Sequence, residues 1–373
     1  MQKKYTSLGL MSGTSGDGVD ASIIYSNGVD KFEVIKDKYF EYDSHIYTSI
    51  HSIKEKIFNI NDLKKLSDEL LVLERKITFF HAKIIEELKF NHEDILVGFH
   101  GQTIYHNPEE KISKQLGDGK LLGQLTKKKI VFNFRKNDIL NGGEGAPLAS
   151  IFHQLIATEK KIILPVCFLN IGGISNITIV KKPIGSLELF SRDIGPGNCL
   201  IDNWVRKNSK EKYDRDGKLA SIGKKNQIIF EQAQELYFNR INKEKLSFDT
   251  NDFDISFARG LSLEDGTTTL TDFTASIIGQ ELSSSILNID KTINDILICG
   301  GGRKNKILLK KIKENLSLNI NMKLIDNFKI NGDFIESQAF AFLAIRSLLK
   351  LPISFPNTTG CAEPCIGGEI IEN

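Results

Sequence analysis

The chain begins with an apolar strand, a turn of small residues and a second apolar strand, and the same plan recurs near its middle. The first copy has strands at residues 5–11 and 19–25 around a turn at 12–18. The second has a strand at 162–170, a turn at 171–176 and a strand that continues to Val180. Small-residue turns between apolar strands are typical of hairpins. Two such openings predict an internal duplication with a cleft between the halves.

Length and charge are consistent with that prediction. The chain has 373 residues, more than the roughly 250–300 at which a single core usually stops growing, so two domains are expected. Its 49 Lys and Arg nearly balance 47 Asp and Glu, which gives no electrostatic reason to expect a nucleic-acid partner. No stretch is apolar enough to cross a membrane, and the start lacks the apolar segment of a signal peptide. We therefore expect a cytoplasmic protein.

The five cysteines fit reduced thiols in the cytoplasm. Their number is odd, none has the CxxC spacing of a zinc site, and Cys361 and Cys365 form the only close pair. A metal or redox role is therefore the less favoured interpretation.

Strands and helices alternate along the rest of the chain. Short apolar strands are expected at residues 95–99, 130–134, 187–190 and 293–299, and helical periodicity covers residues 60–89 and 335–349. Asn61 or Asp62 is expected to cap the first of these helices. Glycine and polar residues gather where the strands end. The pattern predicts an α/β protein with its chemistry at these turns.

Three small-residue turns are candidate phosphate sites. They lie at residues 13–18, at Gly172 and Gly173, and at residues 300–302. Residues without bulk allow close approach to a phosphate, and inward-pointing N–H groups bind anions. Each turn alone could be an ordinary hairpin tip or strand–helix connection. Three together at strand ends predict a bound nucleotide.

Four side chains are candidates for chemistry. Asp193 is expected directly after a strand, beside residues 195–198, which have no evident packing role; it suits a general base or a metal ligand. The alternative, a helix N-cap, is better filled by Asn198. Arg135 could fork onto a ligand carboxylate or form an ion pair with Asp138. Gln102 and Thr103 are candidates for sugar contacts, and His100 is more readily a polar anchor than a catalyst.

Several motifs together resemble the anhydro-N-acetylmuramic acid kinase family. They occur in order from residue 8 to about 368 and lie at residues 9–21, 101–103, 132–135, 145–148, 170–176, 195–198, 213–217, 299–305 and 336–341. The chain departs from the family at Gly16, where Met is usual, and at Ile194, where Thr is usual. A Lys-Ser-Thr-Gly segment of the family is not evident either, and residues 248–254 occupy that region.

The resemblance implies an actin-like ATPase fold, with two duplicated RNase H-like domains around an interdomain ATP cleft. The first domain would comprise residues 1–135 and 336–373, and the second residues 136–335. The turns at 13–20 and 172–176 would bind phosphates, and the turn at 300–302 the adenosine. The implied ATP-binding residues are Gly13, Thr14, Ser15, Gly16, Asp17, Gly18, Val19, Asp20, Gly172, Gly173, Asn176, Gly300, Gly301, Gly302 and Asn305.

The implied reaction uses ATP and Mg²⁺ to open the 1,6-anhydro bridge of N-acetylmuramic acid and to phosphorylate its 6-oxygen, a step of cell-wall recycling. That oxygen is an ether and has no proton to lose, so the base, expected at Asp193, must activate water instead. Asp17 would act on the metal side, and the substrate contacts would be Gln102, Thr103, Arg135, Gly195 and Asn198. The family also suggests a homodimer. The alternatives are another sugar or small-carboxylate kinase of this fold, or an actin-like ATPase without a metabolic product.

Overall fold

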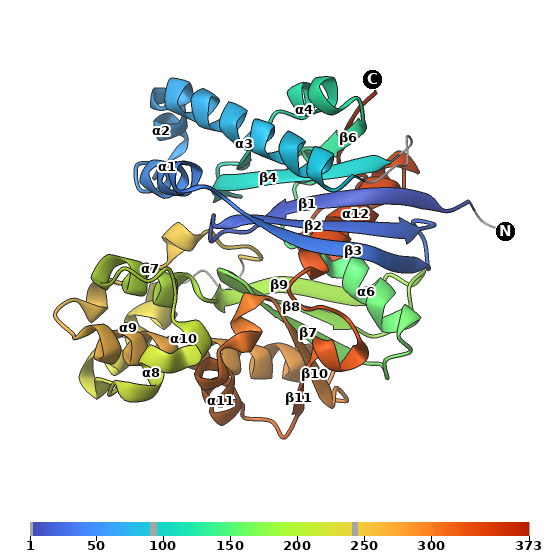
Figure 1. The fold of residues 1–373 in the computed structure, drawn as a ribbon. Coiled ribbons are helices and arrows are strands. Elements are labelled where there is room, and N and C mark those ends of the chain that lie inside the picture. The colour runs from blue at the N-terminus through green and yellow to red at the C-terminus, as the bar shows by residue number, and fades with distance from the viewer. Residues whose placement is uncertain (1–2, 90–94, 241–244, 373) are drawn as a thin grey trace. The chain divides into compact units, whose positions relative to one another are not determined.

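The computed structural model describes residues 3–89, 95–240 and 245–372 (Figure 1). By packing, the chain divides into two compact units. The first comprises Met1–Leu164, Val180–Ser191 and Asp333–Asn373, and the second Pro165–Ile179 and Arg192–Gly332. Residues 136–164, expected in the second domain, pack with the first unit. The boundary of the duplicated domains, which is a matter of topology rather than packing, stays a prediction.

The first unit contains a seven-stranded mixed sheet. Its strands follow the order β12-β6-β4-β1-β2-β3, and β5 pairs with β4. β1 is antiparallel to β2 and parallel to β4, which is parallel to β6. The bounds are β1 Tyr5–Ser12, β2 Gly18–Ser26, β3 Phe32–Glu41, β4 Leu96–Asn107, β5 Ile112–Leu116, β6 Lys129–Phe132 and β12 Glu369–Ile371.

Helices cover both faces of this sheet, as the alternation of β1 requires (Figure 1). Leu8 and Leu10 pack into one buried cluster with apolar residues of α1 and α3. Gly9, between them, faces α12: a Cβ there would lie 1.9 Å from the Ser337 carbonyl oxygen. The helices are α1 Ser44–Lys54, α2 Ile60–Lys65, α3 Ser67–Glu87, α4 Gly119–Thr126, α5 Lys136–Leu140, α6 Ser150–Glu159, α12 Ile335–Leu348 and α13 Pro356–Thr359.

The sheet associated with the second unit repeats the strand order of the first. Its order, read from the other edge, is β9-β8-β7-β10-β11, which is third, second, first, fourth and fifth along the chain. The first sheet reads β3-β2-β1-β4-β6 in the same way, with β5 off this path and β12 added at the edge. The expected α/β class, with two sheets of the same strand order, is thereby confirmed. The bounds are β7 Val166–Ile171, β8 Ile174–Val180, β9 Leu189–Pro196, β10 Asp295–Cys299 and β11 Asn321–Leu324.

The described part of the second unit contains five α-helices. They are α7 Cys199–Asn208, α8 Lys218–Ile222, α9 Gln227–Arg240, α10 Leu263–Ile289 and α11 Lys306–Glu314. Trp204 of α7 and Phe273 of α10 share a buried cluster with Phe248 and Phe253, which lie in the irregular segment before α10. That segment is therefore anchored by apolar packing.

Several local predictions differ from the structure. The strand expected at 162–170 is β7, which begins at Val166 and ends at Ile171. The expected helix at 60–89 is divided at Leu66 into α2 and α3, and Asn59, not Asn61 or Asp62, caps α2. The expected strand at 187–190 is β9, which continues to Pro196, so Asp193 lies within the strand. Proline is tolerated there because β9 is an edge strand of its sheet. The last long helix, α12, begins at Ile335 as expected.

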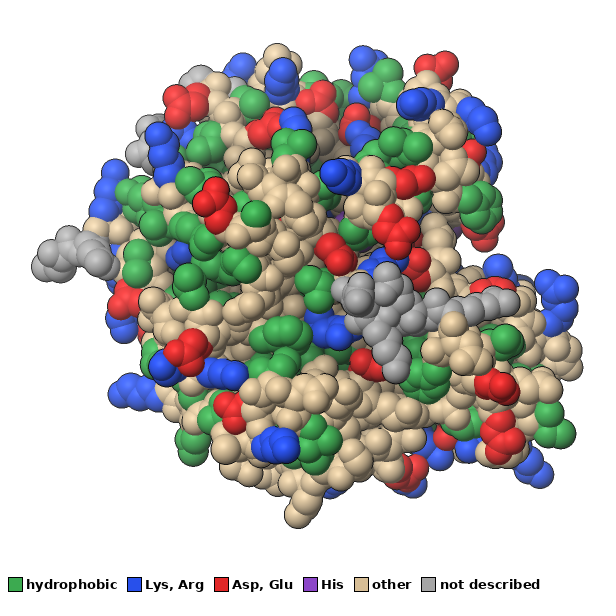
Figure 2. Space-filling view, turned by 180° about the vertical axis from the view of Figure 1, so that it is seen from behind, with side chains coloured by type: hydrophobic (Ala, Val, Ile, Leu, Met, Phe, Trp, Pro, Cys, Tyr) green, Lys and Arg blue, Asp and Glu red, His purple; other side chains and the backbone are tan. Residues whose placement is uncertain are grey.

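Acidic and basic side chains are interspersed over the face shown in Figure 2, and neither kind dominates it. That distribution agrees with the near-neutral charge of the chain. Among the described residues, no helix is both long and apolar enough to cross a bilayer.

Candidate active site

The first phosphate-site candidate connects β1 to β2 and is held by hydrogen bonds within itself. The Gly16 N–H donates to the Gly13 carbonyl (3.2 Å), and the Ser15 hydroxyl donates to Oδ1 of Asp17 (2.6 Å). Gly16 has a φ of 64°, a left-handed conformation that glycine adopts at little cost. The expected hairpin is confirmed, with its turn at residues 13–17. Val19 is fully buried in the core, so only its backbone can contact a ligand.

Two side chains that are distant in the sequence support this turn. The Gln102 side-chain amide donates to the Gly13 carbonyl (2.9 Å), because β4 runs parallel to β1 and pairs Gln102 with Ser12. Lys54 Nζ donates to the Thr14 carbonyl (2.9 Å). Lys54, which the sequence analysis missed, therefore brings a positive charge to the turn. In the sequence, Lys54 is recognisable only as a lysine at the end of an amphipathic helix, which does not indicate a contact with the turn.

Gln102 also presents an unused acceptor. Its side chain is fully buried, and Oε1 has no hydrogen-bond partner among the described residues. A buried amide oxygen without a donor is costly, so an orphan beside this turn fits a ligand hydroxyl or a water molecule. Thr103, the other expected sugar contact, accepts a hydrogen bond from the Gln115 amide (3.3 Å).

Arg135 is held by His100 rather than by Asp138. Its Nη2 lies 3.0 Å from His100 Nε2, and its Nη1 donates to the Gly145 carbonyl (2.7 Å). His100 Nδ1 lies 2.8 Å from the Gly101 carbonyl, so Nδ1 carries the proton and Nε2 accepts. Burial, followed by the charge of Arg135, lowers the pKa of His100 well below its usual value. His100 is thus a neutral anchor, as expected.

The second turn, between β7 and β8, is braced by the start of α7. The Gly197 N–H donates to the Gly173 carbonyl (2.9 Å), and the Asn198 N–H donates to the Gly172 carbonyl (2.8 Å). A Cβ on Gly197 would lie 2.3 Å from the Gly172 oxygen. Residues 195–198 therefore have the packing role that the sequence analysis did not find. Asn198 occupies the N-cap position of α7, but its side chain makes no capping bond. Asn176 lies in β8, half-buried.

Asp193 is a buried carboxylate with a fixed orientation. Its side chain Oδ2 accepts the Phe248 N–H (2.8 Å), and its own N–H donates to the Leu246 carbonyl (2.8 Å). The Phe248 ring is anchored against Phe253, with ring centroids 5.6 Å apart. Residues 248–254, where the chain departs from the family pattern, therefore position the candidate base Asp193. Gly195, two residues later, has a φ of 139° and packs against Ile277.

The third turn leads from β10 into α11. The Gly300 N–H donates to the Gly332 carbonyl (3.1 Å), and the Arg303 guanidinium forms a two-fold ion pair with Asp326 (2.8 and 3.0 Å). That ion pair lowers the pKa of Asp326. Asn305, an expected ATP contact, uses its side chain to cap α11 through the Leu308 N–H (3.0 Å).

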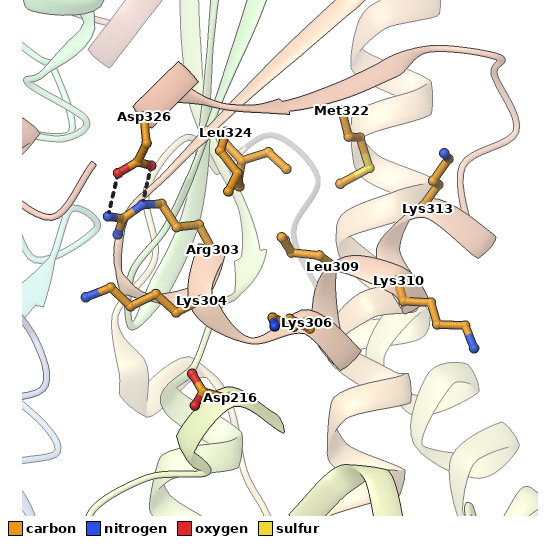
Figure 3. A pocket seen from close by; sticks show the side chains of 11 residues that line it. Asp216, Arg303, Lys304, Lys306, Leu309, Lys310, Lys313, Met322, Leu324 and Asp326 are labelled. Atoms are coloured by element: carbon orange, nitrogen blue, oxygen red, sulfur yellow. Dashed lines mark hydrogen bonds and ion pairs between the residues drawn. The ribbon is translucent and has the colours of Figure 1, made fainter. Parts of the chain in front are cut away.

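A pocket of about 590 Å³ adjoins this third turn (Figure 3). Four apolar side chains line it: Ile298, Leu309, Met322 and Leu324. Charged groups surround them, namely Asp216, Arg303, Lys304, Lys306, Lys310, Lys313 and Asp326. Its volume lies within the range of small-molecule sites.

One glycine in each turn has space that the protein does not use. A Cβ would have its nearest neighbour at 3.7 Å on Gly13 and 3.4 Å on Gly172, and would have none within 4 Å on Gly301. None of the three has a positive φ. Neither packing nor conformation requires glycine there, whereas Gly302 would bring a Cβ to 2.3 Å from Ile171. The open space at these three glycines leaves room for a ligand to approach the backbone.

Comparison with known protein families assigns the chain to one of them. Residues 5–373 match the model of the anhydro-N-acetylmuramic acid kinases. The chain belongs to this family. A curated anhydro-N-acetylmuramic acid kinase of Pelagibacter ubique is 56% identical over the full length of both chains. One of Zymomonas mobilis is 34% identical and covers 97% of this chain and 98% of its own.

A more distant match among solved structures is the activator of the 2-hydroxyisocaproyl-CoA dehydratase of Clostridium difficile. It is 12% identical, with a TM-score of 0.40, and the match covers 92% of this chain and 96% of that chain. The resemblance drawn from the motifs is confirmed by the family match, and the chain is a member of a kinase family. The residue roles stay predictions.

Proposed function

We propose that this chain uses ATP to open 1,6-anhydro-N-acetylmuramic acid and to phosphorylate its 6-oxygen, with Asp193 as the general base. The observation that carries the proposal is the buried Asp193 carboxylate, oriented by the Phe248 N–H at 2.8 Å. Membership of the anhydro-N-acetylmuramic acid kinase family supports the substrate. The product is N-acetylmuramic acid 6-phosphate, an intermediate of peptidoglycan recycling.

ATP binds at the three turns. The open glycines Gly13 and Gly172 let phosphate oxygens approach backbone N–H groups, and Lys54 adds a positive charge beside the first turn. The adenosine occupies the pocket that adjoins the third turn, whose four apolar side chains suit a base (Figure 3). Asp17 fits a hydrated Mg²⁺, directly or through water. Mg²⁺ supplies neutralisation of charge on the transferring phosphoryl group.

The substrate is a carboxylate sugar, and Arg135 suits its lactyl group. A guanidinium whose plane is fixed by His100 and Gly145 is preorganised for a planar carboxylate. Gln102, Thr103, Gly195 and Asn198 are the further substrate contacts that we propose.

The chemistry follows from the ether oxygen of the substrate. Asp193 takes a proton from water, whose oxygen attacks the anomeric carbon as the bond from that carbon to the 6-oxygen breaks. The released 6-oxygen attacks the γ-phosphorus, and ADP leaves. N–H groups of the turns stabilise the charge that develops on the phosphoryl oxygens. A base that deprotonates the acceptor itself would have no proton to remove.

We further propose a cytoplasmic homodimer. All five cysteines are free thiols, which persist in a reducing compartment. Sedimentation equilibrium tests the dimer through the mass of the particle, expected at twice the 41.8 kDa of the chain.

The variant Asp193→Asn tests the base. The amide keeps the shape and can still accept the Phe248 N–H, but it cannot take a proton. General base catalysis contributes about 10²–10⁴-fold, so turnover should fall by at least about 100-fold while ATP affinity stays within a few-fold. Turnover and nucleotide affinity are measured on the same preparation.

Asp202→Asn is the matched control, because Asp202 is also an acid of the second unit and lies in the first turn of α7. It should turn over at a rate within a few-fold of the parent. An Asp193→Asn enzyme as fast as the control removes Asp193 from the mechanism. Loss of ATP binding together with turnover would instead assign Asp193 to the metal.

A further inference from the structure

Three potential metal ligands from two separate segments meet in the first unit. Asp138 of α5, Cys361 and Cys365 each offer one ligand atom, and these atoms all lie within 4.8 Å of one another. The three residues are buried, with exposed fractions of 1%, 1% and 4%. Ligands around one tetrahedral zinc ion are about 3.5–4 Å apart, given Zn–S near 2.3 Å and Zn–O near 2.1 Å. Small shifts therefore suffice for all three to reach one ion.

The carboxylate of this cluster has no cationic partner among the described residues. Asp138 Oδ1 accepts the hydroxyls of Ser354 and Thr359, the latter at 2.6 Å, and Oδ2 accepts the Gly145 N–H at 2.7 Å. Buried carboxylates are normally paired with a cation or bound to a metal. Hydrogen bonds to a carboxylate are also what orients it as a metal ligand.

The backbone fixes both cysteines. Cys365 pairs with Ser354 through an N–H to carbonyl bond of 3.0 Å, and Cys361 follows Gly360, the left-handed residue that ends α13. The Ala362 N–H donates to the Asn141 carbonyl (3.1 Å), directly after α5. The three residues between the cysteines are exposed, so an ion can enter through that loop. The site is therefore preorganised and lies next to solvent.

We propose that Asp138, Cys361 and Cys365 bind a thiophilic divalent ion, Zn²⁺ in the cell, with water as the fourth ligand. The two thiol protons pass to solvent as two metal–sulfur bonds form. The C-x₃-C spacing lies within the range of structural zinc sites, and thiolates select zinc over magnesium. The ion links residues 361–365 to α5. The sequence did not favour this role, because the third ligand is far away along the chain.

Two other arrangements compete with a bound metal. In one, both cysteines stay protonated, with the Cys365 thiol donating to the Glu363 carbonyl as it does here (3.1 Å). In the other, the pair oxidises to a disulfide. In this structure both cysteines are free thiols.

The test is metal binding by the reduced full-length protein after chelator treatment. Co²⁺ should bind with a stoichiometry of one at this site, give a sulfur-to-metal charge-transfer band, and be displaced by Zn²⁺. Cys365→Ser should remove the band and weaken Zn²⁺ binding by more than the 10–100-fold that changes around metal ligands typically cause. Cys361→Ser should have the same two effects, and it provides a second test if Cys365→Ser does not fold. Cys167→Ser is the control, because Cys167 lies in β7 of the other unit.

Denatured protein is first titrated with a thiol reagent, and all five cysteines should react. The proposal is overturned if reduced protein gives no charge-transfer band, if Cys365→Ser binds zinc like the control, or if only three thiols react because the pair is a disulfide. No readout depends on ATP or sugar, so failure here leaves the kinase assignment untouched.

Discussion

We propose different roles for the carboxylates of Asp17 and Asp193, because their surroundings differ. Asp193 is buried and accepts a backbone N–H, which fixes one position for a proton acceptor. Asp17 is half-buried in a turn, and among the described residues its Oδ1 accepts a side-chain hydrogen bond only from Ser15. The turn otherwise offers N–H groups and hydroxyls, which attract phosphate but supply no anionic ligand. Asp17 is therefore the better metal-side residue.

Asp17→Asn should fold normally, because the amide oxygen can still accept the Ser15 hydroxyl. It should need a much higher Mg²⁺ concentration for half-maximal turnover, by roughly 10-fold or more, since an amide is a weaker ligand for a hard cation. Turnover is measured across a magnesium titration at saturating ATP. An unchanged midpoint would leave Asp17 only its hydrogen bond within the turn.

At the scale of elements, glycine marks two different requirements in the third turn. Gly302 is glycine because Ile171 of β7 lies against it, whereas Gly301 has open space. Alanine at 302 should destabilise the fold by about 1–3 kcal/mol through overpacking. Alanine at 301 should leave the unfolding temperature unchanged and weaken ATP binding by about 10-fold. Thermal unfolding and nucleotide titration of the pair decide the matter, and normal ATP affinity in Gly301→Ala would place the nucleotide elsewhere.

The sequence predicts elements better than the contacts between them. Strand–turn–strand patterns located both hairpins, because alternating burial and glycine are local signals. The contacts that hold the site residues in place could not be predicted from such local signals. Lys54 reaches the first turn only because Ile46, Ile50 and Ile53 dock its helix on the core, and the Phe248 N–H reaches Asp193 through packing of an irregular segment. The side chain of Asn305 looked like a ligand contact from its motif but caps α11.

At the scale of the whole molecule, buried histidines make stability depend on pH. Burial lowers the pKa of His81 to about 4 and that of His153 to about 3. The unfolded chain takes up these protons near pH 6.5 while the folded chain does not. The contribution of these histidines to the free energy of unfolding is therefore fully present above pH 6.5. It falls as the pH drops towards 4, by up to about 1.4 kcal/mol per pH unit for each histidine.

His81→Leu tests this dependence, because His81 packs against Tyr42, Phe80 and Phe99 and its Nε2 has no hydrogen-bond partner among the described residues. The free energy of unfolding is measured with denaturant between pH 7 and 4.5. Its slope against pH should be smaller in His81→Leu than in the parent, by about one proton. His45→Gln, at an exposed position of α1, should keep the slope of the parent. Equal slopes in the parent and His81→Leu would show that His81 does not contribute.

The central claim is that one active site adds both water and a phosphoryl group to the same sugar. The direct measurement is the mass of the product formed from 1,6-anhydro-N-acetylmuramic acid, ATP and Mg²⁺. We predict a product heavier than the sugar by the elements of HPO₃ and one H₂O, absent when Asp193→Asn replaces the parent enzyme. A product heavier by HPO₃ alone would mean that the ring stays closed and that an ordinary hydroxyl is the acceptor, which contradicts the account.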